Sequence, residues 1–255
     1  MSLLNFSFAN KVVWLTGSAQ GIGYEIRQSF IENGATVVGF DIQPQTLEHN
    51  FYPVELDLAN AADIAETIEY IKKSQPDIAA PDIFVHAAGV LKIGCTDTIS
   101  MHDWLTSFNV NCHCAFVFLQ SLAANFKSKS ANVVVIGSNA AHVPRLNMAA
   151  YGASKAALTH FIFTYALELA SFGLRANVVS PGSTDTPMLR ALYQDDSFIS
   201  AAIEGSASQF KLGIPLGKIA IPSDIANTVL FLASDLAGHI TMQDIVVDGG
   251  AVLNG

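Results

Sequence analysis

Two side chains near the middle of the chain have the types and the spacing that proton transfer requires. Tyr151 and Lys155 are four residues apart in the segment YGASK, so on a helix both project from one face and can interact. A free tyrosine, with a pKa of about 10, is a poor base at neutral pH. A nearby ammonium group stabilises the phenolate and lowers that pKa. The pair could therefore act as a general base, although the same spacing is also common in surface pairs.

A hydroxyl group near the end of an expected strand could complete such a site. Ser138 follows the apolar run 132–136, which has the composition of a buried strand. Its side chain could bind the oxygen of a reacting alcohol or carbonyl. These three residues need a scaffold that brings them together, and the rest of the chain indicates which one.

The composition describes a globular protein with a large buried core. Of 255 residues, 51% are hydrophobic and 14% charged, which excludes disorder and fits a sheet that is buried on both faces. A net charge of −9 without a basic run argues against nucleic acid or an anionic membrane as the main partner. No apolar run is long enough to span a bilayer, and the first residues lack a signal-peptide pattern. We therefore expect a cytoplasmic protein.

The three cysteines do not indicate a disulfide framework or a metal site. Cys95, Cys112 and Cys114 are too few for disulfide cross-linking of a chain of this length. The segment Cys112-His113-Cys114 lacks a second ligand pair at zinc-finger spacing. We interpret it as helix packing and expect no metal ion.

A glycine-rich turn near the start predicts a phosphate site. The apolar run 11–16 predicts a strand, TGSAQGIG (16–23) follows it, and helical spacing continues over 24–33 up to Gly34. In this context glycines let the backbone approach a diphosphate, and the helix N-terminus supplies N–H groups. The spacing G-x-x-x-G-x-G differs from the standard G-x-G-x-x-G, so the turn alone is a weak indication.

Asp41 strengthens the nucleotide interpretation. It ends the expected strand 35–40, 18 residues beyond Gly23, about where an acidic residue binds a ribose 2′-hydroxyl. A carboxylate there accepts hydrogen bonds from NAD and repels the extra phosphate of NADP. No Arg or Lys occurs in 16–23 or 41–45 to bind that phosphate. The alternative, a turn residue after a strand, is simpler, but with the glycine turn we expect NAD.

Strands and helices alternate along almost the whole chain. This alternation predicts right-handed βαβ units and an α/β fold: one doubly wound Rossmann-type domain over 1–255, with a parallel sheet of about seven strands flanked by helices. The segment 187–212 has no strand period, and we expect helical pieces on a mobile flap. The other expected strands are 54–58, 82–86, 175–180 and 240–247, and the other expected helices are 62–74, 104–126, 148–170 and 223–234.

Five residues stand at the expected carboxyl ends of separate strands, where ligands of such sheets bind. They are Gly17, Asp41, Gly89, Ser138 and Pro181. Their convergence on one crevice is a stronger indication than any single motif.

These motifs together resemble the short-chain dehydrogenase/reductase family over nearly the whole chain. The resemblance rests on TGSAQGIG (16–23), Ala87-Ala88-Gly89, Asn111, Ser138, YGASK (151–155) and Pro181-Gly182. One departure is His86-Ala87-Ala88-Gly89, where the family usually has Asn-Asn-Ala-Gly. Alanine cannot make the inter-strand hydrogen bonds of an asparagine. We therefore expect the segment that lies beneath the bound nucleotide, the nucleotide floor, to be held less tightly.

The resemblance implies a role for each matching residue. Tyr151 is implied as general base, with Lys155 lowering its pKa and binding the nicotinamide ribose. Ser138 is implied to hold the substrate oxygen, and Asn111 to anchor a water that connects Lys155 to solvent. The implied NAD-binding residues are Gly17, Gln20, Ile22, Gly23, Asp41, Asp57, Leu58, Ala88, Gly89, Tyr151, Lys155, Pro181, Gly182, Thr184 and Thr186.

Four longer stretches look more like one branch of the family. They are AAHVPR (140–145), SPGSTDT (180–186), QFKLGIPLGK (209–218) and HITMQDIVVDGG (239–250). Members of that branch oxidise 2,3-dihydro-2,3-dihydroxybenzoate to 2,3-dihydroxybenzoate for catechol siderophores such as enterobactin and vibriobactin. The resemblance also implies a homotetramer and makes contact with the ligase that activates the product plausible.

The carboxylate of such a substrate needs a cation. We expect Arg145, seven residues past Ser138, because a guanidinium group binds a carboxylate with two hydrogen bonds. Lys211 is the second choice, and a solvated loop charge is an equally open interpretation of Arg145. His142 in the same loop is expected to shape the pocket.

Two other functions remain open on the sequence. The first is a short-chain enzyme for another alcohol or ketone, such as a 3-oxoacyl carrier-protein reductase. Asp41 argues against it because those enzymes usually prefer NADPH. The second is an NAD-sensing protein without turnover, which the presence of all four implied catalytic residues disfavours.

Overall fold

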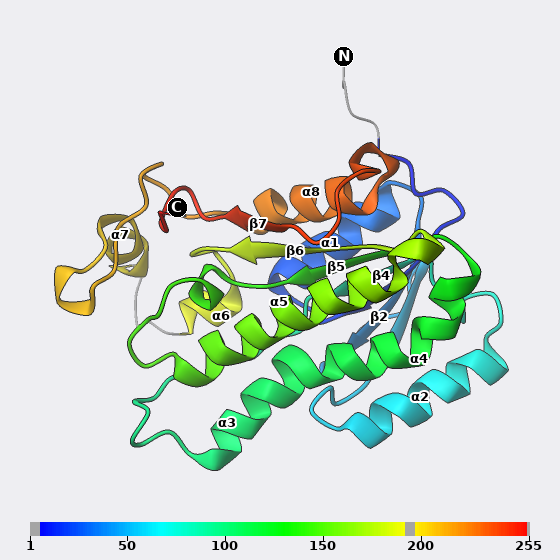
Figure 1. The fold of residues 1–255 in the computed structure, drawn as a ribbon, viewed down its shortest axis with the longest axis horizontal. Coiled ribbons are helices and arrows are strands. Elements are labelled where there is room, and N and C mark those ends of the chain that lie inside the picture. Colours follow the sequence, from blue (N-terminus) through cyan, green and yellow to red (C-terminus); the bar gives the residue numbers. More distant parts are fainter. Residues whose placement is uncertain (1–5, 192–196, 254–255) are drawn as a thin grey trace.

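Seven parallel strands form one sheet in a computed structural model of the chain, which describes residues 6–191 and 197–253 (Figure 1). The sheet order is β3-β2-β1-β4-β5-β6-β7. The order reverses between β1 and β4, and this switch point is where open α/β sheets bind ligands. The strands are β1 Val12–Thr16, β2 Thr36–Asp41, β3 Phe51–Glu55, β4 Ile83–His86, β5 Asn132–Ile136, β6 Arg175–Pro181 and β7 Asp244–Val247.

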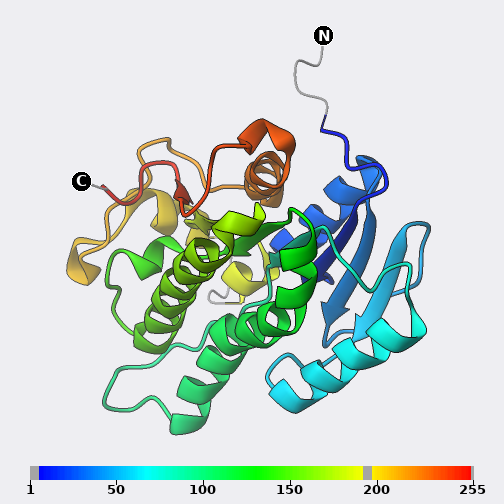
Figure 2. The same ribbon diagram turned by 45° about the vertical axis from the view of Figure 1, so that its right-hand side comes forward.

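Helices cover both faces of the sheet, as the predicted α/β fold requires. Figure 2 shows α2 (cyan), α4 (green) and α5 (yellow-green) on one face, and α1 and α8 pack on the other. The helices are α1 Gly21–Glu32, α2 Ala61–Ser74, α3 Met101–Phe108, α4 Cys114–Ser128, α5 Ala149–Leu169, α6 Pro187–Arg190, α7 Ser197–Glu204 and α8 Pro222–Ala233. None of the helices among the described residues is long and apolar enough to cross a membrane.

Side-chain alternation along β1 divides the core into two layers. Val13 and Leu15 pack under α1 and α8, whereas Trp14 points to the opposite face, as the two-residue period of a strand requires. Trp14 is in register with Phe84 of β4. A strand that is buried on both faces has no polar side to mark it, which explains the continuous apolar run in the sequence.

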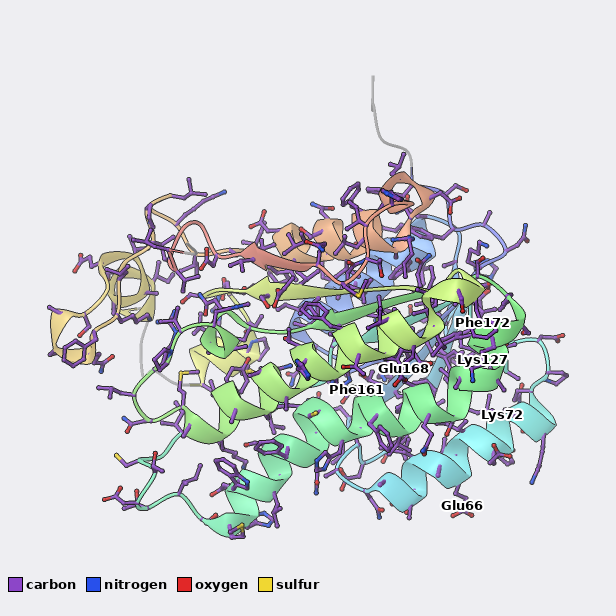
Figure 3. The ribbon with its side chains drawn as sticks, viewed as in Figure 1. Glu66, Lys72, Lys127, Phe161, Glu168 and Phe172 are labelled. Carbon is purple, nitrogen blue, oxygen red and sulfur yellow. The ribbon has the colours of Figure 1, made fainter. Side chains whose placement is uncertain are left out.

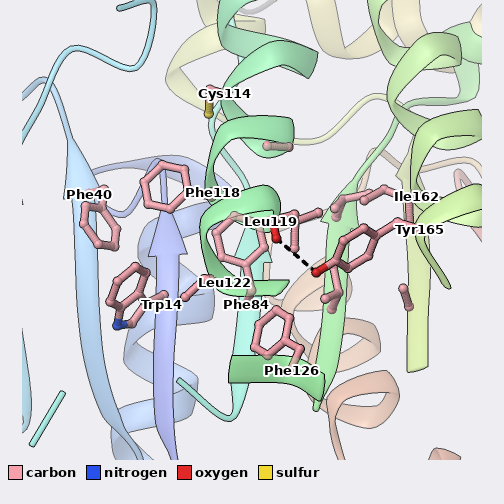
Figure 4. Close-up of a cluster of buried hydrophobic side chains, with 14 of the residues drawn as sticks. Trp14, Phe40, Phe84, Cys114, Phe118, Leu119, Leu122, Phe126, Ile162 and Tyr165 are labelled. Atoms are coloured by element: carbon pink, nitrogen blue, oxygen red, sulfur yellow. Dashed lines mark hydrogen bonds between the residues drawn. The ribbon is translucent and has the colours of Figure 1, made fainter. Parts of the chain in front are cut away.

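An aromatic cluster fills the layer between the sheet and α4 (Figure 4). The ring of Phe118 lies 4.9 Å from that of Phe40, 5.4 Å from that of Phe84 and 6.2 Å from that of Trp14, measured between centroids. The Trp14 indole donates a hydrogen bond to the Ile78 carbonyl at 2.8 Å. Buried rings at these distances contribute both hydrophobic burial and edge-to-face contacts.

Lysine side chains link neighbouring helices on the outer surface of the same layer. Lys72 of α2 donates to the Ser121 carbonyl of α4 at 3.0 Å. The ammonium of Lys127, near the end of α4, lies 5.8 Å from the centre of the Phe172 ring, which follows α5 (Figure 3). These contacts are partly exposed, so we expect each to contribute little to stability.

Most element boundaries differ from the sequence predictions by one to four residues, and three of the differences have an identifiable cause. Strand β3 covers Phe51–Glu55 rather than 54–58, because Pro53 is tolerated in an edge strand. The expected helix 104–126 begins earlier, where Ser100 caps α3, and a π-helical turn at Asn109–His113 separates α3 from α4. Strand β7 starts at Asp244 rather than 240, since Met242 has left-handed backbone with φ of 55°.

The predicted flap contains helical pieces within its described part. These are α6, α7 and a short 3-10 turn at Ala207–Gln209. Residues 192–196 of the predicted flap lie outside the described residues. Whether the flap moves stays a prediction.

We predict that Phe118→Ala lowers the free energy of unfolding by about 3–5 kcal/mol, because it leaves a cavity among rings that cannot collapse into it. Urea unfolding followed by circular dichroism measures this change. Tyr70→Ala on α2 is the control: its side chain is 65% exposed, and we expect a change within about 0.5 kcal/mol. Equal losses in the two variants would contradict the assignment of this core.

Candidate active site

A cavity of about 840 Å³ lies at the carboxyl ends of the strands. It contains every site residue predicted from the sequence except Asn111, and a volume of this order suits a nucleotide together with a small substrate. The predicted residues that line it are Gly17, Gln20, Ile22, Gly23, Asp41, Asp57, Leu58, Ala88, Gly89, Ser138, Arg145, Tyr151, Lys155, Pro181, Gly182, Thr184, Thr186 and Lys211.

The glycine-rich turn has the geometry that a diphosphate group needs. Gly17 has a φ of 75°, and a Cβ atom on it would come within 2.6 Å of the Ala88 backbone. A Cβ atom on Gly23 would collide with the Gly17 carbonyl oxygen. Helix α1 begins at Gly21, so its first free N–H groups lie beside the cavity. The turn therefore fits the nucleotide cofactor that the spacing predicts.

Asp41 connects this turn to the loop after β2. Its carboxylate accepts hydrogen bonds from the backbone N–H of Ala19 at 3.0 Å and of Gln43 at 2.9 Å. Each carboxylate oxygen has a second lone pair, so ribose hydroxyls can still bind. Asp57 lies beyond the end of β3 and accepts from the Ala59 N–H at 2.9 Å.

One cation near Asp41, Arg27, comes from α1 and lies outside the segments 16–23 and 41–45. The Arg27 guanidinium donates to the Gln45 side chain at 3.1 Å, and the same oxygen accepts from Ser18 at 3.0 Å. Arg27 is only 5% exposed and lies 4.6 Å and 4.3 Å from the ring centres of Tyr24 and Phe51. Arg27 therefore holds the loop after β2 through Gln45 and does not line the cavity.

Ser138, Tyr151 and Lys155 meet on one side of the cavity. Ser138 follows β5, while Tyr151 and Lys155 lie in the first two turns of α5. Lys155 is 2% exposed, and its ammonium donates to the Ile136 carbonyl at 2.7 Å. All three side chains line this one cavity, and their catalytic roles stay a prediction.

Burial controls the electrostatics of this group. It raises the pKa of Tyr151, and the hydrogen bond with Ser138 opposes that rise. It also lowers the pKa of Lys155 to about 8, against the influence of Cys112 and Cys114. The expected lowering of the Tyr151 pKa by Lys155 is not met: desolvation of the phenolate sets the direction of the shift, and the opposing effect comes from Ser138.

Asn111 lies behind the cavity wall. Its side chain accepts from the Val90 N–H at 2.8 Å and donates to the Val90 carbonyl at 3.1 Å and to Ser154 at 2.9 Å. It belongs to the π-helical turn, and such turns are frequent at functional sites. The asparagine therefore joins the segment after Gly89 to α5. Its implied water contact stays a prediction.

The neighbouring cysteines pack as the sequence analysis predicted. Cys112 and Cys114 are buried in the core, and His113 bonds to Asn109 at 3.0 Å. Within 6–191 and 197–253, no group of three or more His, Cys, Asp or Glu residues could hold a metal ion.

His86, which departs from the family motif, is fully buried at the end of β4. Its ring nitrogens lie 2.8 Å from the Thr16 hydroxyl and 3.3 Å from the Asn111 carbonyl. Burial lowers the pKa of His86 to about 3, with a further contribution from the charge of Lys155, while the hydrogen bond to Asn111 opposes both. The ring is therefore neutral at physiological pH.

Arg145 and Lys211 line the cavity on the substrate side. Burial lowers the pKa of each. The charge of Asp248 opposes the shift of Arg145, whereas the charge of Arg145 lowers the pKa of Lys211 further, so the two cations share one region. Neither forms an ion pair with any described residue. Two cations in one cavity favour an anionic ligand.

One prediction about this loop is wrong. His142 does not line the cavity, although Ala140 and Pro144 on either side of it do. Its side chain bonds instead to Asp244 of β7 at 2.9 Å. The apolar part of the cavity wall was not predicted, since its residues come from separate loops and helices with no shared motif. It includes Ile93, Val110, Leu146 and Met188.

Comparisons with known proteins agree with this geometry. A family model described as "Enoyl-(Acyl carrier protein) reductase" matches residues 17–252. The 2,3-dihydro-2,3-dihydroxybenzoate dehydrogenase of Escherichia coli (strain K12) is 48% identical over 96% of this chain and 98% of its own length. The vibriobactin-specific 2,3-dihydro-2,3-dihydroxybenzoate dehydrogenase of Vibrio cholerae is 40% identical over 98% and 99%.

Solved structures share the fold over nearly the whole chain. A 4-hydroxyisoleucine dehydrogenase complexed with NADH has a TM-score of 0.82 and 27% identity, covering 96% of this chain and 100% of that one. A short chain dehydrogenase from Leptospira borgpetersenii with bound NAD+ has a TM-score of 0.85 and 25% identity, covering 99% and 98%.

We predict that His86 makes the folded chain sensitive to acid. The unfolded chain binds a proton on this histidine below about pH 6.5, whereas the folded chain keeps it neutral down to about pH 3. As the pH falls through this window, the free energy of unfolding should decrease by up to about 1.4 kcal/mol per pH unit from this group. Urea unfolding at several pH values measures the slope, and His86→Gln should reduce it. An unchanged slope in the variant would contradict the buried, neutral ring.

Proposed function

Because the chain belongs to the short-chain dehydrogenase/reductase family, we propose that it oxidises 2,3-dihydro-2,3-dihydroxybenzoate to 2,3-dihydroxybenzoate in catechol siderophore biosynthesis, with NAD as the hydride acceptor. The observation that carries this proposal is one cavity lined both by Ser138, Tyr151 and Lys155 and by two cations, Arg145 and Lys211, that form no ion pair within the described part of the chain. The first three residues, the proton-transfer group, suit a ring alcohol of the substrate, and the two cations suit the substrate carboxylate. Two relatives named for this activity are 48% and 40% identical.

Asp41 supports NAD rather than NADP. The carboxylate lines the cavity at the end of β2, where it can accept hydrogen bonds from both ribose hydroxyls and repel a 2′-phosphate. The nearby Arg27 is buried under Gln45, so it offers no open cation for that phosphate. The bound nicotinamide supplies the hydride acceptor, which is the chemistry that no side chain provides.

The side chains supply orientation and proton transfer. Ser138 holds the oxygen of the reacting ring alcohol, and Tyr151 in its phenolate form removes the proton from that hydroxyl. Lys155 presents a positive charge beside the phenolate position and favours its ionisation when the site is assembled. Loss of hydride from the same carbon leaves a ketone that tautomerises to the catechol, and aromatisation makes the oxidation strongly favourable.

The substrate carboxylate binds at Arg145 and Lys211 in this proposal. Both side chains are partly buried, and desolvation strengthens a charge-assisted hydrogen bond. A carboxylate placed there relieves the repulsion that lowers the pKa of Lys211. Arg145 is the better first ligand because its guanidinium group can donate two parallel hydrogen bonds.

We also propose that the enzyme is a cytoplasmic homotetramer. Large apolar side chains remain exposed on α4 and after α5, including Phe116 at 46% and Phe172 at 44%, and Leu167 of α5 is 68% exposed. A face of this kind on two adjacent helices suits a second copy of the chain. Contact with the ligase that activates 2,3-dihydroxybenzoate remains part of the proposal, without a surface assigned to it.

The activity itself gives the first test. Purified protein with 2,3-dihydro-2,3-dihydroxybenzoate should form NADH and a catechol with NAD, and much less product with NADP. Tyr151→Phe should lower kcat by about 10²–10⁴-fold, the usual contribution of a general base. Preference for NADP would contradict the role of Asp41. Full activity of the variant would contradict the role of Tyr151.

A second test concerns the carboxylate. We predict that Arg145→Gln raises KM for the natural substrate by about 10- to 100-fold, the range of a charge-assisted hydrogen bond. For the same ring diol without its carboxylate, KM should be similar in the variant and in the unmodified enzyme. Lys218→Gln removes an equal charge outside the cavity and should leave KM unchanged. A rise in KM for both substrates would show that Arg145 acts on pocket shape rather than on the carboxylate.

A further inference from the structure

His86 has a set of partners that the proposed reaction does not use. The residue is 0% exposed, yet both of its ring nitrogens have polar partners. These partners come from two other segments: Thr16 at the end of β1 and Asn111 in the π-helical turn. A buried ring with two polar contacts across three segments is a specific structural element rather than a filler of space.

The partners identify the tautomer of the ring. Nε2 faces the Asn111 carbonyl at 3.3 Å, and a carbonyl can only accept. Nε2 must therefore carry the hydrogen. Nδ1 is then an acceptor, and the Thr16 hydroxyl at 2.8 Å donates to it. The same hydroxyl oxygen accepts from the Ala88 N–H at 3.3 Å, so donors and acceptors match along the whole chain of hydrogen bonds.

The surroundings explain why the ring stays neutral. Burial is the main cause, and Lys155 of α5 adds a positive charge. The thiols of Cys112, in the π-helical turn, and of Cys114, at the start of α4, lie near the same ammonium group. The Cys114 sulfur lies 3.7 Å from Nδ1. Burial raises the pKa of both thiols. No negative charge from these elements compensates a second cation beside Lys155, and the imidazolium form would also lose the Thr16 donor.

We propose that His86, as the neutral Nε2–H tautomer, is a positioning residue that joins the nucleotide floor to the π-helical turn behind Lys155. Through Thr16 it holds the backbone next to Gly17 and Ala88, which line the cavity. Through Asn111 it holds the turn whose side chain bonds to Val90 and to Ser154 of α5. It thereby compensates for the alanines at 87 and 88, which offer no side-chain hydrogen bonds to this floor.

This arrangement predicts an effect on the reacting geometry. Gly89 lies between the Asn111 side chain and the Lys155 ammonium: a Cβ atom placed on it would be 3.5 Å from the first and 3.6 Å from the second. Loss of the hydrogen bond from His86 to the Asn111 carbonyl would let the segment around Gly89 shift relative to the Lys155 ammonium. We therefore expect kcat to respond more strongly than KM for NAD.

The tautomer can be tested directly in the unmodified protein. Two-bond ¹H–¹⁵N spectra of histidine-labelled protein distinguish the Nε2–H, Nδ1–H and doubly protonated rings. The chain has seven histidines, and the His86 signal is the one that disappears in His86→Gln. We expect the Nε2–H pattern with no titration over about pH 5–8, where an ordinary histidine titrates. An Nδ1–H ring, or one that titrates in this range, would overturn the proposal.

Two variants separate the partners of the ring. The amide of Gln reaches the position of Nε2 and can still donate to Asn111, whereas the shorter Asn reaches only the position of Nδ1 and faces Thr16. We expect kcat of His86→Gln to exceed that of His86→Asn by about fivefold, the scale of one ordinary hydrogen bond, with KM for NAD within about threefold of the unmodified enzyme in both. An Asn variant as active as the Gln variant, or more active, would overturn the proposal.

The kinetic comparison rests on the proposed dehydrogenase reaction, but the spectra do not. If the protein fails to turn over 2,3-dihydro-2,3-dihydroxybenzoate, the proposed substrate is wrong. NAD binding by the two variants, followed by intrinsic fluorescence, then replaces the kinetic comparison, and Gln is again expected to bind more like the unmodified protein than Asn. Failure of the His86 proposal thus differs from failure of the proposed function.

Discussion

The buried ammonium group of Lys155 constrains the structure around it. With 2% exposure and a hydrogen bond to the Ile136 carbonyl, it places a positive charge in a region where burial already disfavours the ionisation of His86, Cys112 and Cys114. His86 remains neutral because a second cation there would be neither solvated nor paired. Tyr151, on the same helix as Lys155, is also desolvated, which raises its pKa. A site of this kind is prepared for a negative charge that forms during a reaction, which is how preorganised active sites lower barriers.

The parallel sheet makes this arrangement possible. Because every strand runs in the same direction, the segments after β1, β2, β4, β5 and β6 open toward one edge, and the switch between β1 and β4 leaves room for a nucleotide. Packing on both faces restrains the strand ends, since buried aromatic side chains such as Phe118 lie between the sheet and α4. The site therefore depends on core residues such as Trp14 and Phe118, which do not line the cavity themselves.

Much of the fold and of the site could be predicted because the signals are local. Tyr151 and Lys155 share a helix face by their spacing alone, and the glycine turn stands where a strand meets a helix. Where the predictions departed from the structure, the competing effect was not local. The edge position of β3 tolerates Pro53, and the π-helical turn at Asn109–His113 depends on contacts with distant segments.

The sequence alone determines the alternation of strands and helices, the residues at the strand ends and the chemistry of Ser138, Tyr151 and Lys155. It does so because side-chain type and periodicity are properties of neighbouring residues. Burial is different: it depends on every segment that excludes water. Burial raises the pKa of Tyr151, against the expected shift. Long-range packing places His142 against Asp244 and His86 between Thr16 and Asn111. Those outcomes arise from desolvation and long-range packing, which have no signature in sequence spacing.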